Sequence, residues 1–100
     1  MSDVAFLQKN QPWTVPYTAE VAEDMVRLAA HNVLHAAKSV GKLSAVFEAV
    51  DHGHPMDVDT IKDMAADLFT AAMRFANLYG FDLETELRRR VLDKNGVGYP

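Results

Sequence analysis

Apolar residues recur at helical spacing along the first half of the chain. Between residues 18 and 50 there is no proline and a single glycine, Gly41. At about 100° per residue, one stripe of this stretch collects the apolar positions. The stripe comprises Ala22, Val26, Ala29, Val33, Ala36, Val40, Leu43, Phe47 and Val50. The pattern predicts a long helix over 18–50, with Thr18 as its N-cap and this stripe buried.

A second helical pattern follows the break at His52-Gly53-His54-Pro55. It predicts a helix over 58–79 that begins at Asp57 or Asp59 and ends at Gly80. Its apolar face comprises Ile61, Met64, Ala65, Leu68, Ala72, Phe75, Ala76 and Tyr79. Asp82 can then cap a third, short helix that ends near residue 92. No segment has the two-residue period of a strand, so we expect an all-α fold built on two long antiparallel helices.

The chain divides into an arm, a helical domain and a tail. Residues 1–17 are interrupted by prolines and carry large aromatic side chains, so we expect an irregular arm that packs on the domain or on a second subunit. Residues 18–95 form the helical domain and 96–100 the tail. Two long helices and one short one enclose little core, so we expect a homo-oligomer. The alternative is a monomeric bundle that the arm completes.

Composition excludes several function classes. A net charge of -4 at pH 7 argues against general nucleic-acid binding. The absence of cysteine excludes disulfides, thiolate zinc sites and a cysteine nucleophile. The chain has neither the order of a signal peptide nor an apolar run that could span a bilayer. We therefore expect a soluble, cytoplasmic protein with no membrane partner.

A row of basic and imidazole side chains lies on the first long helix, away from its apolar stripe. It comprises His31, His35, Lys38, Lys42 and His52. The second helix offers Asp63 and Asp67 outside its own apolar face, so the lysines either pair with these carboxylates, bind an anionic ligand or face solvent. The i,i+4 spacing of His31 and His35 also suits chelation of a transition metal, although no carboxylate accompanies the pair. No glycine-rich phosphate loop or serine nucleophile motif is present.

The second half of the chain resembles a known enzyme family. Asp63-Met-Ala-Ala-Asp67, then Ala76-Asn77-Leu-Tyr-Gly80-Phe-Asp82-Leu-Glu84, then Lys94-Asn95 resemble motifs of the MazG-like all-α nucleoside triphosphate pyrophosphohydrolases. Lys38-Ser39-Val40-Gly41-Lys42-Leu43 is similar to their Glu-Glu-Val-Gly-Glu-Leu, and the resemblance spans 28–95. It implies a helical bundle that assembles as a dimer or tetramer. It also implies carboxylates on two helices that hold Mg²⁺, and hydrolysis of NTPs or dNTPs to monophosphate and pyrophosphate.

The chain departs from the family at the metal ligands. Ser39, Lys42 and Met64 occupy three of the four expected carboxylate positions, and Asp67 alone is retained. Because Mg²⁺ requires oxygen ligands, we expect weak or no hydrolysis and no metal cofactor. The expected role is nucleotide or phosphate binding, or a structural or regulatory role in which Lys42 pairs with Asp67. The candidate phosphate-binding residues are His35, Lys38, Lys42, Lys94 and Asn95.

Two other readings stay open. In the first, the protein is an active Mg²⁺-dependent pyrophosphohydrolase with a displaced metal site made of Glu48, Asp51, Asp63 and Asp67. In the second, the fold serves as an interaction module whose aromatic arm holds a partner. The sequence leaves undecided whether the protein is an enzyme.

Overall fold

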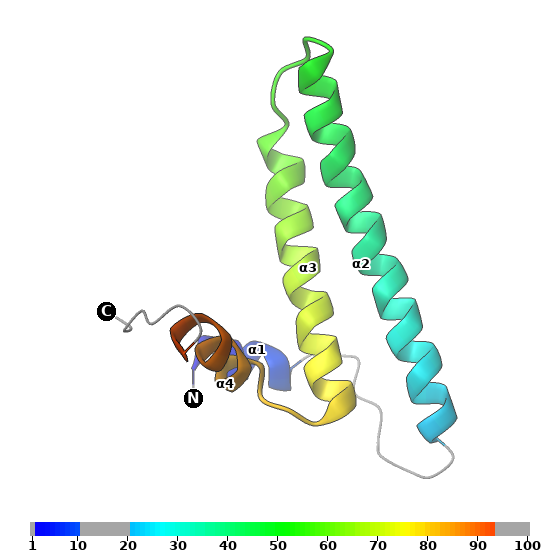
Figure 1. Ribbon diagram of the computed structural model, residues 1–100, viewed down its shortest axis with the longest axis vertical. Helices are drawn as coiled ribbons and strands as arrows, with labels where there is room; N and C mark the ends of the chain where they lie inside the picture. The colour runs from blue at the N-terminus through cyan, green and yellow to red at the C-terminus, as the bar shows by residue number, and fades with distance from the viewer. Residues whose placement is uncertain (1, 11–20, 94–100) are drawn as a thin grey trace.

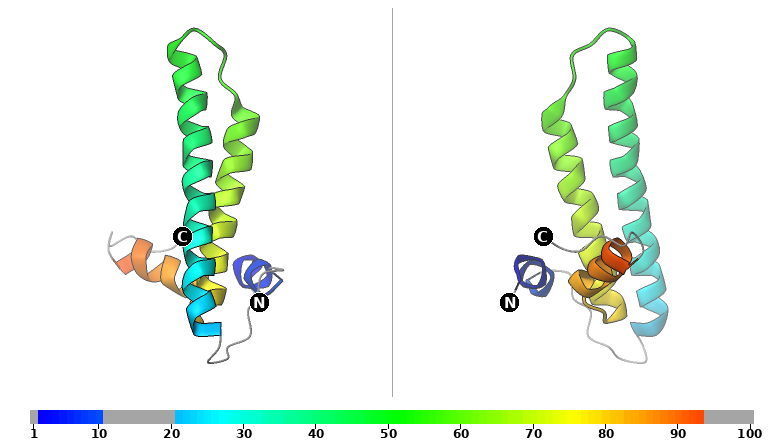
Figure 2. Two further views of the ribbon diagram at one scale, coloured as in Figure 1. Left: turned by 90° about the vertical axis from the view of Figure 1, so that its right-hand side faces the viewer. Right: turned by 60° about the vertical axis from the view of Figure 1, so that its left-hand side comes forward.

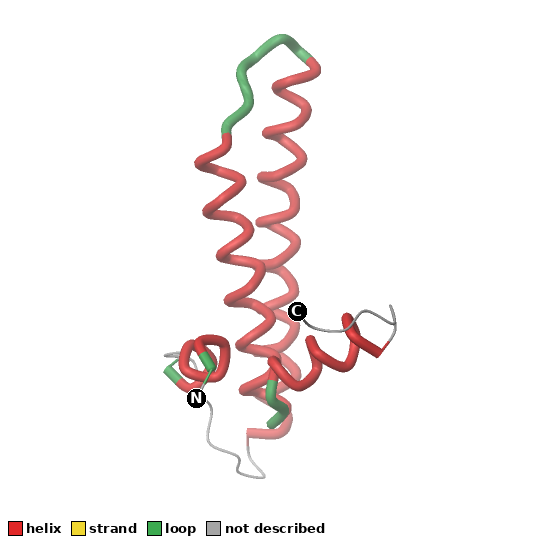
Figure 3. The backbone as a smooth tube through the Cα atoms, turned by 90° about the vertical axis from the view of Figure 1, so that its left-hand side faces the viewer, coloured by secondary structure: helices red, strands yellow, loops and turns green. Residues whose placement is uncertain are grey.

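The computed structural model describes residues 2–10 and 21–93, and within these ranges every regular element is helical (Figure 3). The elements are α1 (Asp3–Lys9), α2 (Val21–Asp51), α3 (Val58–Tyr79), α4 (Leu83–Arg88) and a final π-helical turn, η1 (Arg89–Asp93). The all-α prediction is confirmed. None of the helices in the described ranges has the length and apolarity needed to cross a membrane.

Helices α2 and α3 form an antiparallel hairpin that dominates the molecule (Figure 1). At the end of α2, Gly53 has a φ of 87°, a left-handed conformation that a residue with a Cβ adopts at a cost. The Gly53 amide donates to the Val50 carbonyl at 3.0 Å, and the His54 amide donates to the Ala49 carbonyl at 2.9 Å. The glycine in the predicted break therefore lets the chain reverse between the two helices.

The ends of α3 follow the local signals in the sequence. Asp57 is the N-cap, and its carboxylate accepts hydrogen bonds from the Thr60 amide at 3.0 Å and the Thr60 hydroxyl at 2.6 Å. These hydrogen bonds, the hydroxyl's first, lower the pKa of Asp57 below its ordinary value. At the other end Gly80 has a φ of 70° and closes the helix. The predicted bounds of this helix are confirmed.

The contact between α2 and α3 repeats every seven residues. Its buried positions are Met25, Asn32, Ser39 and Val46 on α2, and Met64, Ala71 and Leu78 on α3. A seven-residue interval is typical of two helices that stay in contact over many turns at a shallow crossing angle. Two of these four α2 positions, Asn32 and Ser39, are therefore polar.

The apolar stripe predicted to be buried on α2 lies largely outside this contact, which corrects the sequence-based expectation. Val26 is 65% exposed, and Val33, Val40 and Phe47 are each 52% exposed. Helix α3 packs against the neighbouring flank of α2, so the stripe is only partly covered within one chain. On α3 the predicted face is buried in part, since Ala65 and Tyr79 are exposed.

A second core lies on the other side of α3, where α1 and α4 pack beside its C-terminal end (Figures 1 and 2). Met73, Ala76 and Leu83 form this core. The partly buried residues packed against it are Val4, Phe69 and Ala72. Helix α3 thus lies between α2 on one side and the two short helices on the other.

Residues 3–9 of the predicted irregular arm form helix α1, which is a further correction. Ser2 caps this helix by accepting a hydrogen bond from the Ala5 amide at 3.0 Å, with Asp3 in the first turn and Lys9 in the last. These local signals precede Pro12 and are sufficient for two helical turns. Residues 11–17, with the other aromatic side chains of the arm, lie outside the described residues.

Gln8 connects α1 to the rest of the chain through its side chain and its backbone carbonyl. The Gln8 amide nitrogen donates to the Phe81 carbonyl at 2.8 Å, and its amide oxygen accepts from the Leu83 amide at 3.0 Å. The Gln8 carbonyl also accepts from the Asn77 side chain at 2.8 Å. Gln8 therefore joins α1 to the turn between α3 and α4, and this part of the arm packs on its own domain.

Candidate functional site

Two adjoining cavities lie along the groove between α2 and α3. The first has a volume of about 240 Å³ and is lined by His35, Ser39, Asp67, Thr70, Ala71 and Arg74. The second, of about 200 Å³, is lined by His31, Asn32, His35 and Arg74. Because His35 and Arg74 border both, the two cavities form one polar site, which we call the α2–α3 site.

Helical spacing explains why these side chains meet. On α2, His31, His35 and Ser39 are each four residues apart and therefore follow one side of the helix. On α3, Asp67 and Arg74 are seven residues apart and lie two turns from each other on one side. The antiparallel packing of the two helices brings these two rows together across the groove.

Asn32 contributes a buried acceptor to the α2–α3 site. Its side chain is 1% exposed, and its Nδ2 donates to the Ala71 carbonyl at 2.8 Å. Its Oδ1 is buried and has no hydrogen-bond partner within the described part of the chain. An unsatisfied buried acceptor costs about 1–3 kcal/mol. Asn32 also lines the second cavity, so a donor group bound there lies beside a residue with an unsatisfied acceptor.

His31 and His35 form a close pair at the edge of the site. Their Nε2 atoms are 2.9 Å apart, and the rings meet edge to face with centroids 4.5 Å apart. For this contact to be a hydrogen bond, one ring must donate its N–H and the other must present a lone pair. Both rings are exposed to solvent, so the pair is open to a ligand.

Two hydroxyl groups complete the lining of the first cavity. Ser39 is 7% exposed and lies in the contact between the helices. The Thr70 hydroxyl donates to the Ala66 carbonyl at 3.0 Å, which leaves its oxygen able to accept a hydrogen bond. With Arg74, His35 and Asp67, the cavity offers a fixed cation, an imidazole, two hydroxyls and a carboxylate.

The structure separates the predicted phosphate-binding residues. His35 lies in the α2–α3 site, whereas Lys38 is exposed and does not line either of its cavities. Lys42 lines a different cavity, nearer the loop, with Val46 and Thr60 among its other walls. Lys94 and Asn95 lie outside the described residues.

The pairing of Lys42 with Asp67 is not observed, which corrects that expectation. Asp67 borders the first cavity beside Ser39, whereas Lys42 borders the cavity nearer the loop. The ion pairs seen elsewhere in the described part of the chain include those of His52 with Glu48, Arg88 with Glu84 and Arg89 with Glu86. The helix register therefore places Ser39, one turn before Lys42, at the level of Asp67.

The four carboxylates of the alternative magnesium site are also dispersed. Glu48, Asp51, Asp63 and Asp67 are all exposed. Glu48 lies 4.0 Å from the Nε2 of His52 near the end of α2, whereas Asp67 lies in the α2–α3 site. Within the described ranges, no three histidine, aspartate or glutamate side chains are close enough to hold one metal ion.

Sequence reasoning missed three residues of the site. Arg74 and Thr70 lie outside the predicted apolar face of α3 and, like Asn32, were not among the candidate residues. The signal for Arg74 is its seven-residue interval from Asp67, which equals the interval of the helix contact. Asn32 lies at the same interval from Ser39, but a polar residue next to an apolar stripe is ordinarily expected to face solvent.

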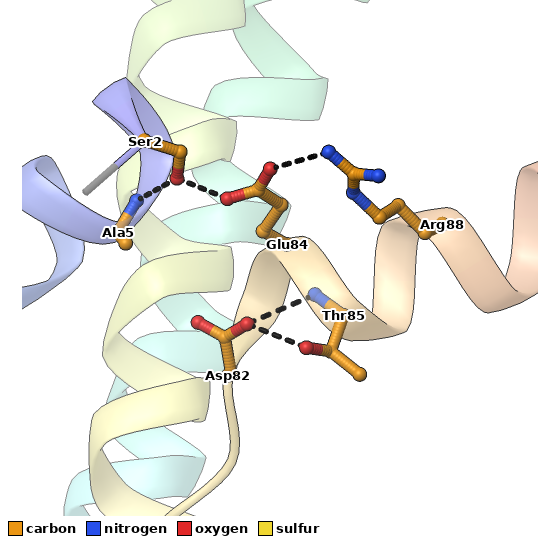
Figure 4. Close-up of polar contacts among 6 residues, drawn as sticks. All are labelled: Ser2, Ala5, Asp82, Glu84, Thr85 and Arg88. Carbon is orange, nitrogen blue, oxygen red and sulfur yellow. Dashed lines mark hydrogen bonds and ion pairs between the residues drawn. The ribbon is translucent and has the colours of Figure 1, made fainter. Parts of the chain in front are cut away.

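A separate polar cluster fixes α1 against α4 (Figure 4). The Ser2 hydroxyl donates to Glu84 Oε2, and Arg88 donates to Glu84 Oε1 at 3.1 Å. The Ser2 hydrogen bond and then that of Arg88 lower the pKa of Glu84 below its ordinary value. Asp82 caps α4 by accepting from the Thr85 amide at 3.1 Å. This cluster has a structural role, since its groups bond one another.

The α2–α3 site can therefore bind a small molecule with an anionic group for Arg74 and donor groups for Asp67 and Asn32. The first cavity is lined mainly by polar surface, which favours a polar ligand over an apolar one. Comparison of the chain with models of protein families, with curated proteins and with solved structures gives no match.

Proposed function

We propose that the protein binds a small phosphate-bearing molecule of the nucleotide class in the α2–α3 site, with weak or no hydrolysis. Arg74 supplies a planar guanidinium whose donors match phosphate oxygens. His35, on the facing helix, lines both cavities with Arg74 and can donate from the other side. Ser39 and Thr70 add hydroxyl groups to the first cavity.

Asp67 indicates that the ligand carries more than a phosphate group. A carboxylate in the same cavity repels a bare anion but accepts hydrogen bonds from hydroxyl or amino groups. A nucleotide has both, in its sugar and its base. We therefore expect a nucleotide to bind more tightly than inorganic phosphate.

The single observation that carries the proposal is the unsatisfied oxygen of Asn32. This side chain is buried, lines the cavity that Arg74 and His35 also border, and keeps Oδ1 without a partner among the residues that the structure describes. Buried acceptors nearly always have a hydrogen-bond partner in native proteins, so an acceptor without one indicates that a bound molecule supplies the donor. An amino group of a nucleobase is such a donor.

The resemblance to the MazG-like family agrees with this proposal in its ligand and differs in its chemistry. In that family the corresponding pair of helices holds Mg²⁺ and a triphosphate. Here two of the corresponding ligand positions, Ser39 and Met64, are buried between α2 and α3 at 7% exposure each. Neither position offers a carboxylate, so binding without efficient hydrolysis is the expected outcome.

We further propose that the chain forms a homo-oligomer, at least a dimer, through the uncovered stripe of α2. Val26, Val33, Val40 and Phe47 recur every seven residues, and each is more than half exposed. Of the described helices, α2 contacts α3 alone. An apolar seam at heptad spacing is the pattern by which helices associate with a second copy.

Ligand titrations test the binding proposal. We expect AMP, ATP and the corresponding deoxynucleotides, measured by calorimetry and thermal shift without Mg²⁺, to include at least one that binds and stabilises the protein. Arg74→Gln should weaken that binding by about tenfold or more, because it removes a charged hydrogen-bond donor. Arg90→Gln, which removes the same charge from η1, is the matched control and should leave the affinity unchanged.

Two results would contradict the proposal. If none of the nucleotides shifts the melting temperature or releases heat, the site does not bind this class of ligand. If addition of Mg²⁺ leads to rapid release of pyrophosphate, and Glu48→Gln abolishes it, the protein is an enzyme with the displaced carboxylate site.

A further inference from the structure

We propose that His31 and His35 form a chelating site for a divalent transition metal of the Cu²⁺ or Ni²⁺ type. The two residues lie one turn apart on α2, and their Nε2 atoms are 2.9 Å apart. Neutral imidazole nitrogens are common ligands of these metals. The two Nε2 atoms thus lie side by side at the surface, and a metal would bind in place of the proton of the hydrogen bond between them.

The distance between the two nitrogens indicates the geometry of the site. Metal–nitrogen bonds to histidine are about 2.0–2.1 Å long. Two such bonds at a right angle place the nitrogens about 2.9 Å apart, whereas a tetrahedral angle places them about 3.3–3.4 Å apart. The observed 2.9 Å is that of a hydrogen bond between the rings, so a metal replaces the proton between them, and only a small change in separation then gives neighbouring positions of a square-planar or tetragonal ion. Cu²⁺ and Ni²⁺ favour this arrangement, and Zn²⁺ favours the tetrahedral one.

The surroundings of the pair suit an ion whose remaining ligands are water. Both rings line the 200 Å³ cavity that also contains Asn32, whose buried Oδ1 has no partner within the described residues. This oxygen can accept a hydrogen bond from a metal-bound water. Arg74 lines the same cavity, and its positive charge lowers the affinity for a cation while it favours an anion as an additional ligand of the metal.

The metal site does not depend on the proposed nucleotide ligand. Both protein ligands come from adjacent turns of α2, so the pair forms wherever this helix is intact. The metal alone can therefore serve as the probe, in the absence of any nucleotide.

The test is a titration of the full chain with Cu²⁺ and with Ni²⁺ in a buffer that does not coordinate metals. We expect one ion per chain and a rise in melting temperature on binding, because the chelate joins two turns of the folded helix. His31→Gln and His35→Gln should each weaken binding by at least about tenfold and remove the thermal shift, because one remaining imidazole cannot chelate. For Cu²⁺, electron paramagnetic resonance should show two coordinated nitrogens in the wild type.

The double variant His52→Gln/His54→Gln is the matched control, because these are the other two histidines of the chain and His52 lies 4.0 Å from Glu48. It should bind the metal with unchanged affinity. The proposal is overturned if both single variants keep the wild-type affinity, if the control variant loses binding, or if the wild type binds neither ion. Since His31 and His35 are exposed, we expect the variants to fold, and their unfolding curves without metal verify this.

Discussion

Asn32 is buried in the contact between α2 and α3. An apolar side chain at this position would pack there without burying a polar atom that needs a hydrogen-bond partner. Its Nδ2 bonds the Ala71 carbonyl, but its Oδ1 is buried without a partner within the described chain. The unsatisfied oxygen therefore lowers the stability of the free protein, and a ligand that donates a hydrogen bond to it would restore that stability. A similar conflict between stability and binding is common at functional sites.

Replacement of Asn32 by leucine should separate these two effects. Asn32→Leu has nearly the same shape and removes both the unsatisfied acceptor and the hydrogen bond to the Ala71 carbonyl, so we expect the free energy of unfolding to stay equal or to rise by up to about 1 kcal/mol. The same variant should lose affinity for the nucleotide identified in the titrations. Urea denaturation and calorimetry measure the two quantities, and a variant that is less stable but binds normally would contradict this role for Asn32.

Glu84 makes the docking of α1 sensitive to acid. Hydrogen bonds from Ser2 and Arg88 hold its pKa in the folded protein below the ordinary value of 4.5. Its contribution to stability is therefore present above pH 4.5 and is lost as the pH falls through the lowered value. We expect amide exchange in α1 to accelerate in this acidic range, as measured by NMR.

Glu84→Gln provides the control for this pH dependence. The amide keeps a hydrogen-bond acceptor for Ser2 but does not titrate, so the local acid sensitivity of α1 should disappear. If α1 remains equally sensitive to acid in this variant, another group is responsible.

At the scale of elements, α3 is the helix on which the others depend. One side of it contacts α2 through Met64, Ala71 and Leu78, and another contacts α1 and α4 through Met73 and Ala76. Its capped ends at Asp57 and Gly80 define its length. A substitution on the face of α3 that contacts α1 and α4 should therefore destabilise the packing of the short helices as well as the whole domain.

Met73→Ala tests the importance of this second core. Met73 is 3% exposed and packs with Ala76 and Leu83, so its truncation should lower the free energy of unfolding by about 2–5 kcal/mol. Met56→Ala is the matched control, since Met56 is 44% exposed, and should change stability by less than about 0.5 kcal/mol. If the two variants lower the free energy of unfolding equally, the cluster around Met73 contributes no more to stability than an exposed methionine does.

At the scale of the whole molecule, the chain is extended rather than compact. Its radius of gyration is 16.5 Å, whereas a compact domain of this length has about 13 Å. The α2–α3 hairpin accounts for this shape, because the short helices cover only its lower end (Figure 2). Most of α2 therefore has one helical neighbour and an apolar stripe that a second copy could cover.

Val33→Glu tests the proposed oligomer. Val33 is 52% exposed in the middle of the stripe, and a buried charge there would oppose association, so the dissociation constant should rise by about tenfold or more. Val58→Glu is the matched control, because Val58 is 50% exposed and lies outside the stripe. Analytical ultracentrifugation measures both, and a wild-type chain that stays monomeric at high concentration would contradict the proposal.

The positions and ends of the long helices could be predicted from the sequence alone. The second predicted helix has the observed bounds of α3, and the first ends within one residue of the end of α2, while its predicted N-cap, Thr18, lies outside the described residues. These features depend on local interactions, such as the Asp57 cap, the Gly53 break and the Gly80 end, which a short stretch of sequence contains in full. The same is true of the cap at Asp82.

Which side of α2 faces α3 was decided only by the tertiary structure. The apolar surface of α2 is wide enough to present either flank, and the observed contact places Asn32 and Ser39 inside while Val33 and Val40 remain exposed. The composition of the α2–α3 site depends on this packing, because the register of the two helices brings Arg74 to His35 and separates Lys42 from Asp67. Residues far apart in sequence meet according to the packing of whole helices, and periodicity along one helix contains no information about its neighbour's register.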